Sequence, residues 1–157
     1  MLEIERKFRV KNTTFLSNIK ESYKITQGYL NSSEDRTVRV RIKGNQGFLT
    51  IKGKSSENGL SRFEWEKEIS VLEATELLKL CEDFVISKTR HLFPFNDVVF
   101  EVDVFEGANE GLIVAEVELN SENQTFEKPD WLGDELTGDL QYYNSYLSNH
   151  PYTTWNR

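Results

Sequence analysis

Charged residues recur at every second position in most segments of this sequence that could form β-strands, and each run carries one sign. The acidic runs are Glu3/Glu5, Glu64/Glu66/Glu68, Glu101/Asp103 and Glu116/Glu118. The basic runs are Arg39/Arg41/Lys43, Lys52/Lys54 and Lys88/Arg90. Residues two apart on a strand share a face, and like charges on one face repel each other. Such runs would be useful if the basic faces held a polyanion and the acidic faces held divalent cations, such as Mg²⁺, that bridge to it.

Two arrangements of these faces fit the pattern. In the first, the apolar faces form a core and the charged faces meet water, which is common in antiparallel sheets. In the second, the charged faces point into a barrel and helices cover its apolar outer side. Burial of so many ions is prohibitive unless they are paired, hydrated and neutralised by a charged ligand. The pattern alone leaves both arrangements open.

The strands that position these residues are indicated by a period of two. The segment 2–10 places Glu3, Glu5, Lys7 and Arg9 on one face and mainly apolar residues on the other. Seven further segments have strand character: 24–31, 37–43, 48–54, 61–70, 84–93, 98–106 and 112–120. Eight antiparallel strands suffice to close a barrel, which removes exposed edges.

Helical segments are expected at three places: about 12–22, 71–80 and about 138–147. A turn is expected at 94–97, and the Trp-containing stretch 129–133 is expected to be part of a loop. We therefore predict an α+β, mainly β fold, namely a closed eight-stranded antiparallel β-barrel with a few peripheral helices.

Length and composition restrict the class of protein. A chain of 157 residues fits a single domain, 1–157, and 38% hydrophobic residues with 12% aromatic residues are typical of a folded protein. The net charge of −7 argues against a nucleic-acid binder, so any anion site must concentrate positive charge locally. Neither a membrane-spanning apolar run nor a signal-peptide pattern is found. We expect a cytoplasmic protein, monomeric or homodimeric, that binds neither nucleic acid nor membrane.

The stretch Leu2-Glu3-Ile4-Glu5-Arg6-Lys7-Phe8 resembles the E-x-E-x-K signature that opens the CYTH domain, also called the triphosphate tunnel metalloenzymes. Further matching segments follow in order: Gly28-Tyr29-Leu30, Val38-Arg39-Val40-Arg41, Thr50-Ile51-Lys52, Gly59-Leu60-Ser61-Arg62, Lys88-Thr89-Arg90, Glu101-Val102-Asp103-Val104-Phe105 and Val114-Ala115-Glu116-Val117-Glu118. The ordered set covers essentially the whole chain and is highly specific. The resemblance implies a tunnel with a charged interior that binds a triphosphate and a divalent metal, and it therefore favours the second arrangement.

The resemblance also implies roles for particular residues. The expected phosphate-binding residues are Lys7, Arg39, Arg41, Lys52, Arg62, Lys88 and Arg90. The expected ligands of Mg²⁺ or Mn²⁺ are Glu3, Glu5, Asp103, Glu116 and Glu118, with Glu64, Glu66 and Glu101 as further candidates. Lys88, Glu5 and Glu116 are the expected catalytic residues, and Tyr29 is expected to pack at the tunnel mouth or to orient a basic side chain.

One departure concerns the C-terminal segment. Relatives often have D-x-R-Y-x-N there, whereas this chain has Asp139-Leu140-Gln141-Tyr142-Tyr143-Asn144. Because Gln141 replaces a basic residue, the sequence weakens the case that this segment contacts the substrate.

The resemblance is greatest to the small bacterial members that hydrolyse inorganic tripolyphosphate. We expect metal-dependent hydrolysis of a triphosphate by in-line attack of water. Positioning and charge stabilisation provide most of the catalysis in phosphoryl transfer, so no Ser, Cys or His nucleophile is required. The alternatives are a class IV adenylyl cyclase, which needs a purine pocket that the sequence does not identify, a thiamine triphosphatase, and a non-catalytic polyphosphate-binding module.

Overall fold

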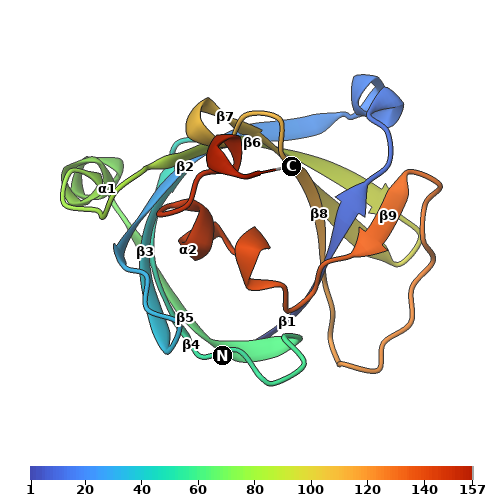
Figure 1. The fold of residues 1–157 in the computed structure, drawn as a ribbon, viewed down its shortest axis with the longest axis horizontal. Coiled ribbons are helices and arrows are strands. Elements are labelled where there is room, and N and C mark those ends of the chain that lie inside the picture. Colours follow the sequence, from blue (N-terminus) through green and yellow to red (C-terminus); the bar gives the residue numbers. More distant parts are fainter. Residues whose placement is uncertain (157) are drawn as a thin grey trace.

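The strands with alternating residue types form a closed ring in the computed structural model, which describes residues 1–156 (Figure 1). The strands are β1 (Leu2–Val10), β2 (Glu21–Asn31), β3 (Arg36–Lys43), β4 (Gln46–Gly53), β5 (Ser61–Ile69), β6 (Ile86–Phe95), β7 (Val98–Glu106), β8 (Ile113–Glu118) and β9 (Leu132–Glu135). The first eight lie in the order β5-β4-β3-β2-β6-β7-β8-β1, and pairing of β1 with β5 closes the barrel. All these pairs are antiparallel, which confirms the predicted eight-stranded barrel.

Strand β1 joins the two sides of the ring and pairs with three other strands. Its first residues pair with β5 through Leu2↔Phe63, Glu3↔Arg62 and Ile4↔Ser61. Its later residues pair with β8 on the opposite edge. Pairing with β5 ends at Ile4. Further along the same edge of β1, β9 pairs with Phe8 and Val10. The charged signature of β1 is thereby fixed at the seam of the barrel.

Three of the expected elements differ from the structure. The segment 129–133 was expected to be a loop, but its end forms the start of the ninth strand, Leu132–Glu135. The helix expected over 12–22 is only a 3₁₀ turn, Thr14–Asn18, and β2 already begins at Glu21. The helix expected over 138–147 is a 3₁₀ turn, Leu140–Tyr142, followed by the short helix α2 (Asn144–Leu147).

The expected turn at 94–97 is also shorter, because β6 continues through Pro94 to Phe95. The chain reverses at Asn96-Asp97, where Asn96 has a φ of 54°. Asparagine tolerates this left-handed conformation better than most residues, which explains why the reversal is placed there.

Helix α1 (Val71–Leu78) confirms the expected helix over 71–80 and lies on the outer side of the barrel (Figure 1). Ser70 caps it by accepting a hydrogen bond from the backbone N–H of Glu73, whose carboxylate accepts one from Ser70 N–H. Gly47 of β4 lets α1 approach, since a Cβ there would lie 3.0 Å from the Cβ of Ala74. Within residues 1–156, no helix is long and apolar enough to cross a membrane.

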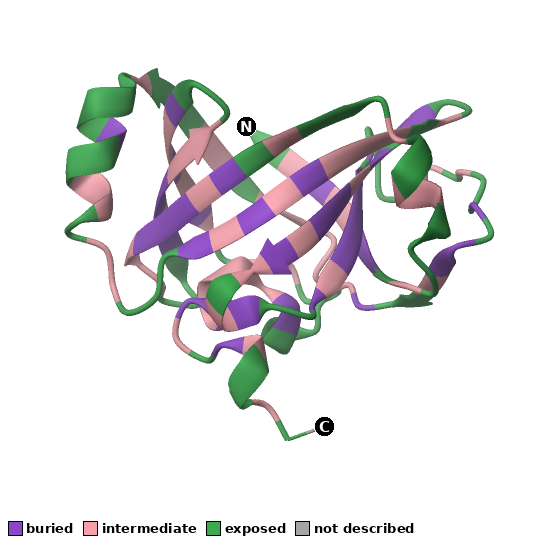
Figure 2. Ribbon diagram, turned by 90° about the horizontal axis from the view of Figure 1, so that it is seen from above, coloured by how far each residue is buried: buried purple, intermediate pink, exposed green. Residues whose placement is uncertain are grey.

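Two apolar clusters lie on opposite sides of the barrel wall. The first lies on the outer face, where Phe8, Phe100 and Val102 alternate with inward charged residues and are covered by Trp131 and Leu132. The second lies inside the barrel at one end and contains Tyr29, Ile86, Phe105, Leu112, Val114, Leu136, Tyr142 and Leu147. Its last members belong to the C-terminal segment (red), which lies across one end of the ring (Figures 1 and 2). The interior of the barrel is thus lined by apolar residues at that end and by charged residues elsewhere.

Candidate functional site

The barrel interior contains a cavity of about 200 Å³ lined by charged side chains from most of the strands. Within residues 1–156, the cationic residues that line it are Lys7, Arg39, Arg41, Lys43, Lys52, Arg62, Lys88 and Arg90. Its seven carboxylate residues are Glu3, Glu5, Glu64, Glu66, Glu101, Glu116 and Glu118. The cavity therefore carries slightly more positive than negative charge although the chain has a net charge of −7. The charged faces point inward, as the second arrangement predicts.

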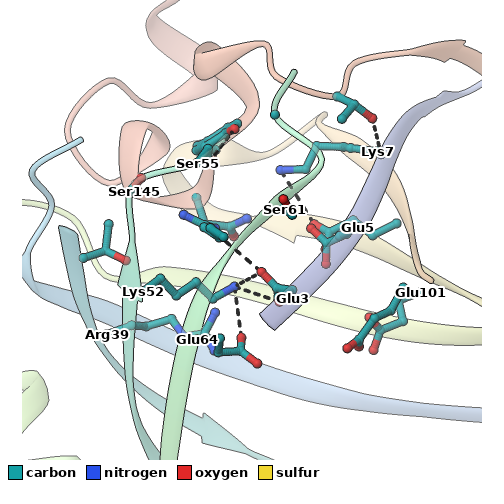
Figure 3. Close-up of a pocket in the computed structure, with 18 of the residues that line it drawn as sticks. Glu3, Glu5, Lys7, Arg39, Lys52, Ser55, Ser61, Glu64, Glu101 and Ser145 are labelled. Carbon is teal, nitrogen blue, oxygen red and sulfur yellow. Dashed lines mark hydrogen bonds and ion pairs between the residues drawn. The ribbon is translucent and has the colours of Figure 1, made fainter. Parts of the chain in front are cut away.

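Alternation along each strand explains why these particular residues face the cavity. On β1, Glu3, Glu5 and Lys7 point inward, whereas Ile4 and Phe8 belong to the outer apolar cluster. Figure 3 shows Glu5 and Glu101 on one side of the cavity, and Glu3, Lys52 and Glu64 close together on another. A shift of one residue in register would exchange the two faces, so the outer cluster also fixes which charges face the cavity.

Three carboxylates form a group that could bind a metal ion. One oxygen from each of Glu5, Glu101 and Glu116 lies within 4.8 Å of the others. The three residues come from β1, β7 and β8, and Glu101 is directly opposite Glu116 in the β7–β8 pairing. Hard divalent cations such as Mg²⁺ and Mn²⁺ prefer carboxylate oxygens, so the donor set fits such an ion.

The three carboxylates of this group differ in their electrostatic surroundings, and Glu101 is paired with Arg90 at 3.1 Å. Burial, followed by repulsion from Glu116 and Glu3, raises the pKa of Glu5 well above its usual value. Burial also acts to raise the pKa of Glu116, but Lys7, Arg90 and Lys88 together hold it well below its usual value. The Nζ of Lys7 lies 3.8 Å from Oε1 of Glu116. One member of the pair is thus ionised while its neighbour favours the protonated form.

Glu3 occupies a different electrostatic environment from Glu5. Lys52 Nζ lies 2.9 Å from Glu3 Oε1 and 3.3 Å from Glu64 Oε2, and Arg62 Nε lies 3.6 Å from Glu3 Oε1. Burial opposes ionisation of Glu3, but attraction to Lys52 lowers its pKa to about 2. The oxygens of Glu3 therefore already contact cations. Glu118 lines the cavity and has no ion pair within residues 1–156, and burial followed by repulsion from Glu3 and Glu101 raises its pKa.

Asp103 lies behind the cavity wall, bound to two of the cations. Its carboxylate accepts hydrogen bonds from Arg90 Nε at 2.7 Å and Arg90 Nη2 at 2.8 Å, and Lys88 Nζ lies 2.7 Å away. Asp103 is fully buried, and among the described residues it is not part of the cavity lining. Burial opposes ionisation of Asp103, but Arg90 and Lys88 lower its pKa. In this structure its oxygens hold Lys88 and Arg90 in place, outside the group of Glu5, Glu101 and Glu116.

The cations from β3 and β6 lie close enough to one another to shift each other's pKa values. Burial, followed by repulsion from Arg39 and Arg90, lowers the pKa of Arg41 to about 9. Burial also lowers the pKa of Lys88 to about 8, although Asp103 acts against this change. The Nε of Arg39 is one of two buried side-chain polar atoms in residues 1–156 that lack a hydrogen-bond partner. A buried donor without a partner is costly, so this wall is suited to receive an anion.

The C-terminal segment contributes contacts that the sequence did not predict. Lys7 Nζ donates to the backbone oxygen of Tyr142 at 2.8 Å. The ring of Tyr143 lies 5.3 Å from Lys7 Nζ and 5.4 Å from Arg62 Cζ, and its hydroxyl is 3.1 Å from Ser55 Oγ. Gln141 is exposed, so the missing positive charge at that position does not affect the cavity. The segment lines the cavity through Tyr143, Asn144 and Ser145, and its contact with a substrate stays a prediction.

Tyr29 lies where the charged cavity meets the interior apolar cluster. It is 5% exposed, so it lines the closed end of the cavity rather than an open mouth. The structure thus brings every predicted site residue except Asp103 to the cavity lining.

A barrel whose interior combines a cationic wall with a carboxylate group defines the chain as a member of the CYTH family, whose domain model, the CYTH domain, matches residues 1–148. The chain is 48% identical over 151 residues to an inorganic triphosphatase of Acetivibrio thermocellus, with coverage of 96% of this chain and 95% of that protein. It is 40% identical over 152 residues to an inorganic triphosphatase of Nitrosomonas europaea, with coverage of 94% and 97%. The crystal structure of the inorganic triphosphatase NE1496 superposes with a TM-score of 0.65 at 34% identity and covers 93% of each chain.

Proposed function

We propose that this protein hydrolyses inorganic tripolyphosphate with the help of a divalent metal ion, Mg²⁺ or Mn²⁺. The proposal rests on the distribution of charge in the cavity. Cations lie on one wall, and the carboxylates of Glu5, Glu101 and Glu116 lie on another. The negative oxygens of a short polyphosphate would pair with the cations, and its metal ion would pair with the carboxylates. The relatives named as inorganic triphosphatases support the same substrate.

In this proposal the cationic residues bind the phosphate oxygens, and they are Lys7, Arg39, Arg41, Lys52, Arg62, Lys88 and Arg90. Glu5, Glu101 and Glu116 would hold the metal, Glu118 is paired in register with Glu5, Glu3 lines the same cavity, and Asp103 fixes Lys88 and Arg90. When bound, a divalent ion neutralises phosphate charge and makes a coordinated water more acidic. Arg39 and Arg41 stabilise the charge that develops on the departing pyrophosphate.

Lys88, Glu5 and Glu116 are the proposed catalytic residues. With a pKa of about 8, Lys88 is present in both protonation states near neutral pH, so it can bind phosphate when charged and accept a proton when neutral. Glu116 is ionised and can accept a hydrogen bond from the attacking water. Glu5, beside it, completes the group that orients this water in line with the terminal phosphorus.

A second cavity, of about 580 Å³, adjoins the charged one. Because of this cavity, organic triphosphates have to be compared with tripolyphosphate as substrates. It shares Ser55, Arg62 and Tyr143 with the charged cavity and is also lined by Tyr146 and His150. This space could admit the organic part of ATP or thiamine triphosphate, so the adenylyl cyclase and thiamine triphosphatase functions are retained as alternatives. A cytoplasmic location and a monomeric or homodimeric state remain part of the proposal.

The test is phosphate release from tripolyphosphate, ATP and thiamine triphosphate in Mg²⁺, Mn²⁺ or EDTA. We expect strong, EDTA-sensitive release from tripolyphosphate, and we expect Glu116→Gln and Lys88→Ala to reduce turnover by at least about a hundredfold while the fold persists. Cyclic AMP formed from ATP without phosphate release would identify a cyclase instead. Tight tripolyphosphate binding without any turnover would identify a binding module.

A further inference from the structure

Two uncharged amide side chains, Gln27 and Asn144, join the C-terminal segment to the cationic wall. Gln27 is on β2 and is fully buried. Its Nε2 donates to Asn144 Oδ1 at 3.0 Å, and its Oε1 accepts from Arg41 Nε at 3.0 Å. Asn144, the first residue of α2, accepts a second hydrogen bond through Oδ1 from Lys88 Nζ, also at 3.0 Å.

The chemistry of the donors fixes the direction of this chain. A guanidinium and an ammonium can only donate, so the oxygen of Gln27 must face Arg41 and the oxygen of Asn144 must face Lys88. The amide nitrogen of Gln27 is then left to donate to Asn144. Both amides have one working orientation, and each one holds a cation of the cavity at a defined place.

The two amides carry no charge, and this property indicates how they act on the cations. Within residues 1–156, Arg41 forms no ion pair, although Arg39, Lys52, Lys88 and Arg90 all do. Gln27 therefore positions Arg41 without cancelling its charge. Lys88 is already paired with Asp103 at 2.7 Å, and Asn144 adds a second contact that brings no further negative charge. A carboxylate at either amide position would hold the cation equally well but would compete with phosphate for it.

We propose that Gln27 and Asn144 are positioning residues, which hold Arg41 and Lys88 in place for the phosphate chain without adding negative charge beside them. The proposal rests on the proposed function, because it assigns the two amides a part in tripolyphosphate hydrolysis. It also gives the C-terminal segment a part in the reaction, since Asn144 belongs to that segment.

The competing explanation is that Asn144 only fastens the C-terminal segment to the barrel, and Asn149 offers a matched control for it. Asn149 lies in the same segment and donates through Nδ2 to Ser32 Oγ at 3.0 Å, at the end of the barrel and away from the cationic wall. Asn149→Ala removes one amide tether of the same kind without touching Lys88 or Arg41.

The experiment compares Asn144→Ala, Gln27→Met and Asn149→Ala in steady-state hydrolysis of tripolyphosphate and in thermal unfolding. We expect Asn144→Ala and Gln27→Met to lower kcat by about tenfold to a hundredfold, since small misplacements of catalytic groups have effects of that size. KM should change little, because the cations remain in the cavity. The double variant should lose scarcely more than the worse single variant, because the two amides act as one unit. Asn149→Ala should keep kcat within about twofold of the wild type.

A binding measurement tests whether the neutrality of Asn144 matters for substrate binding or whether its side chain has only a structural role. Asn144→Asp keeps the acceptor oxygen but adds negative charge, so metal-free titration calorimetry should show at least tenfold weaker tripolyphosphate binding than in Asn144→Ala. This variant also provides the test if Asn144→Ala does not fold.

Equal losses of kcat in Asn144→Ala and Asn149→Ala would overturn the inference, as would unchanged kcat in Asn144→Ala or equal affinities in the two Asn144 variants. The wild type is assayed alongside. An inactive wild type would refute the proposed function and the inference with it, whereas an active wild type with unaffected amide variants would refute the inference alone.

Discussion

Glu5 and Glu116 lie diagonally to each other on the adjacent strands β1 and β8, and their pKa values move in opposite directions. The difference follows from their neighbours, because Lys7, Arg90 and Lys88 surround Glu116, whereas repulsion from Glu116 and Glu3 outweighs the attraction of Lys52 for Glu5. Because its pKa is raised, the Glu5 carboxylate binds a proton more readily than an ordinary glutamate does, and a metal cation would take the place of that proton. Metal binding and proton binding are therefore expected to compete at this residue.

We predict that Mg²⁺ or Mn²⁺ binding near neutral pH releases a proton from the wild-type protein. Burial, followed by repulsion from Glu116 and Glu3, raises the pKa of the Glu5 carboxyl, and a proton held there must leave before the group becomes a ligand. Titration calorimetry in two buffers with different ionisation enthalpies measures the proton count. Glu5→Gln should bind the metal more weakly and release fewer protons. The same proton release in wild type and Glu5→Gln would contradict the assignment.

A second prediction at this scale concerns Lys88. Its pKa of about 8 lies below the usual value for lysine, so the side chain is charged below pH 8 and neutral above it. Metal-free affinity for tripolyphosphate should therefore fall by up to about fourfold between pH 7 and pH 8.5, a range below the pKa of about 9 of Arg41, as the Lys88 contact to the polyanion loses its charge. The pH series is measured by calorimetry. Lys88→Arg stays charged throughout, so a similar fall in this variant would show that another group is responsible.

Among the elements, β7 shows how a strand serves the fold with one face and the site with the other. Phe100 is fully buried in the outer cluster, in edge contact with Trp131 and Phe126. Its neighbour Glu101 faces the cavity. The apolar face thus provides the packing energy that holds the carboxylates of this strand close to those of β1 and β8.

We predict that Phe100→Ala lowers the free energy of unfolding by about 3–5 kcal/mol, the usual range for deleting a fully buried aromatic ring. Leu80→Ala should change it by less than about 0.5 kcal/mol, because Leu80 is 72% exposed. Chemical denaturation of both variants provides the measurement. A loss below about 1 kcal/mol for Phe100→Ala would show that the outer cluster does not stabilise this wall.

The sequence predicted the elements with a long regular period and failed on the short ones. Strands such as β3 and β7 alternate over eight or more residues, so their position and inward face could be inferred. Strand β9 has only four residues, and its place depends on pairing with β1 and on packing of Leu132, which no local pattern reveals. The expected helix over 12–22 failed for a related reason, since pairing of β2 with β6 includes Glu21 and Ser22.

The candidate site divides in the same way. Inward charged residues could be predicted because charge, period and family motif agree at Glu5, Lys88 and Glu116. The position of Asp103 behind the wall could not, because its alternation with Val102 is the same as that of Glu101. Gln27 and Asn144 are uncharged and distant in the chain, so only the folded structure shows that they meet.

For the molecule as a whole, the contact of Gly59 with Gly138 links the loop between β4 and β5 to the C-terminal segment. Gly59 has a φ of +74°, and a Cβ there would lie only 2.4 Å from the Cα of Gly138. A side chain at Gly59 would push away the segment that carries Tyr142 and Asn144. The two glycines therefore determine how closely the segment closes this end of the barrel.

We predict that Gly59→Ala reduces tripolyphosphate hydrolysis by at least about tenfold and destabilises the protein by more than the roughly 1–2 kcal/mol of an unfavourable positive φ. Gly44→Ala is the matched control, because Gly44 has a φ of +59° and open space within 4 Å of its Cβ position. It should lose about 1 kcal/mol of stability and keep its activity. Activity and thermal unfolding are measured for both, and equal behaviour would show that the contact is unimportant.

The position of β1 at the seam has a consequence for synthesis of the chain. Its residues leave the ribosome well before those of β8, which supplies half of its paired partners and lies more than a hundred residues later. At translation rates of about 5–20 residues per second, the nascent strand waits roughly 5–20 s before these partners exist. During this time its apolar residues and its carboxylates are both without their final neighbours. Catalytic activity should therefore arise all at once, late in translation, and no nascent fragment that ends before β8 should hydrolyse the substrate.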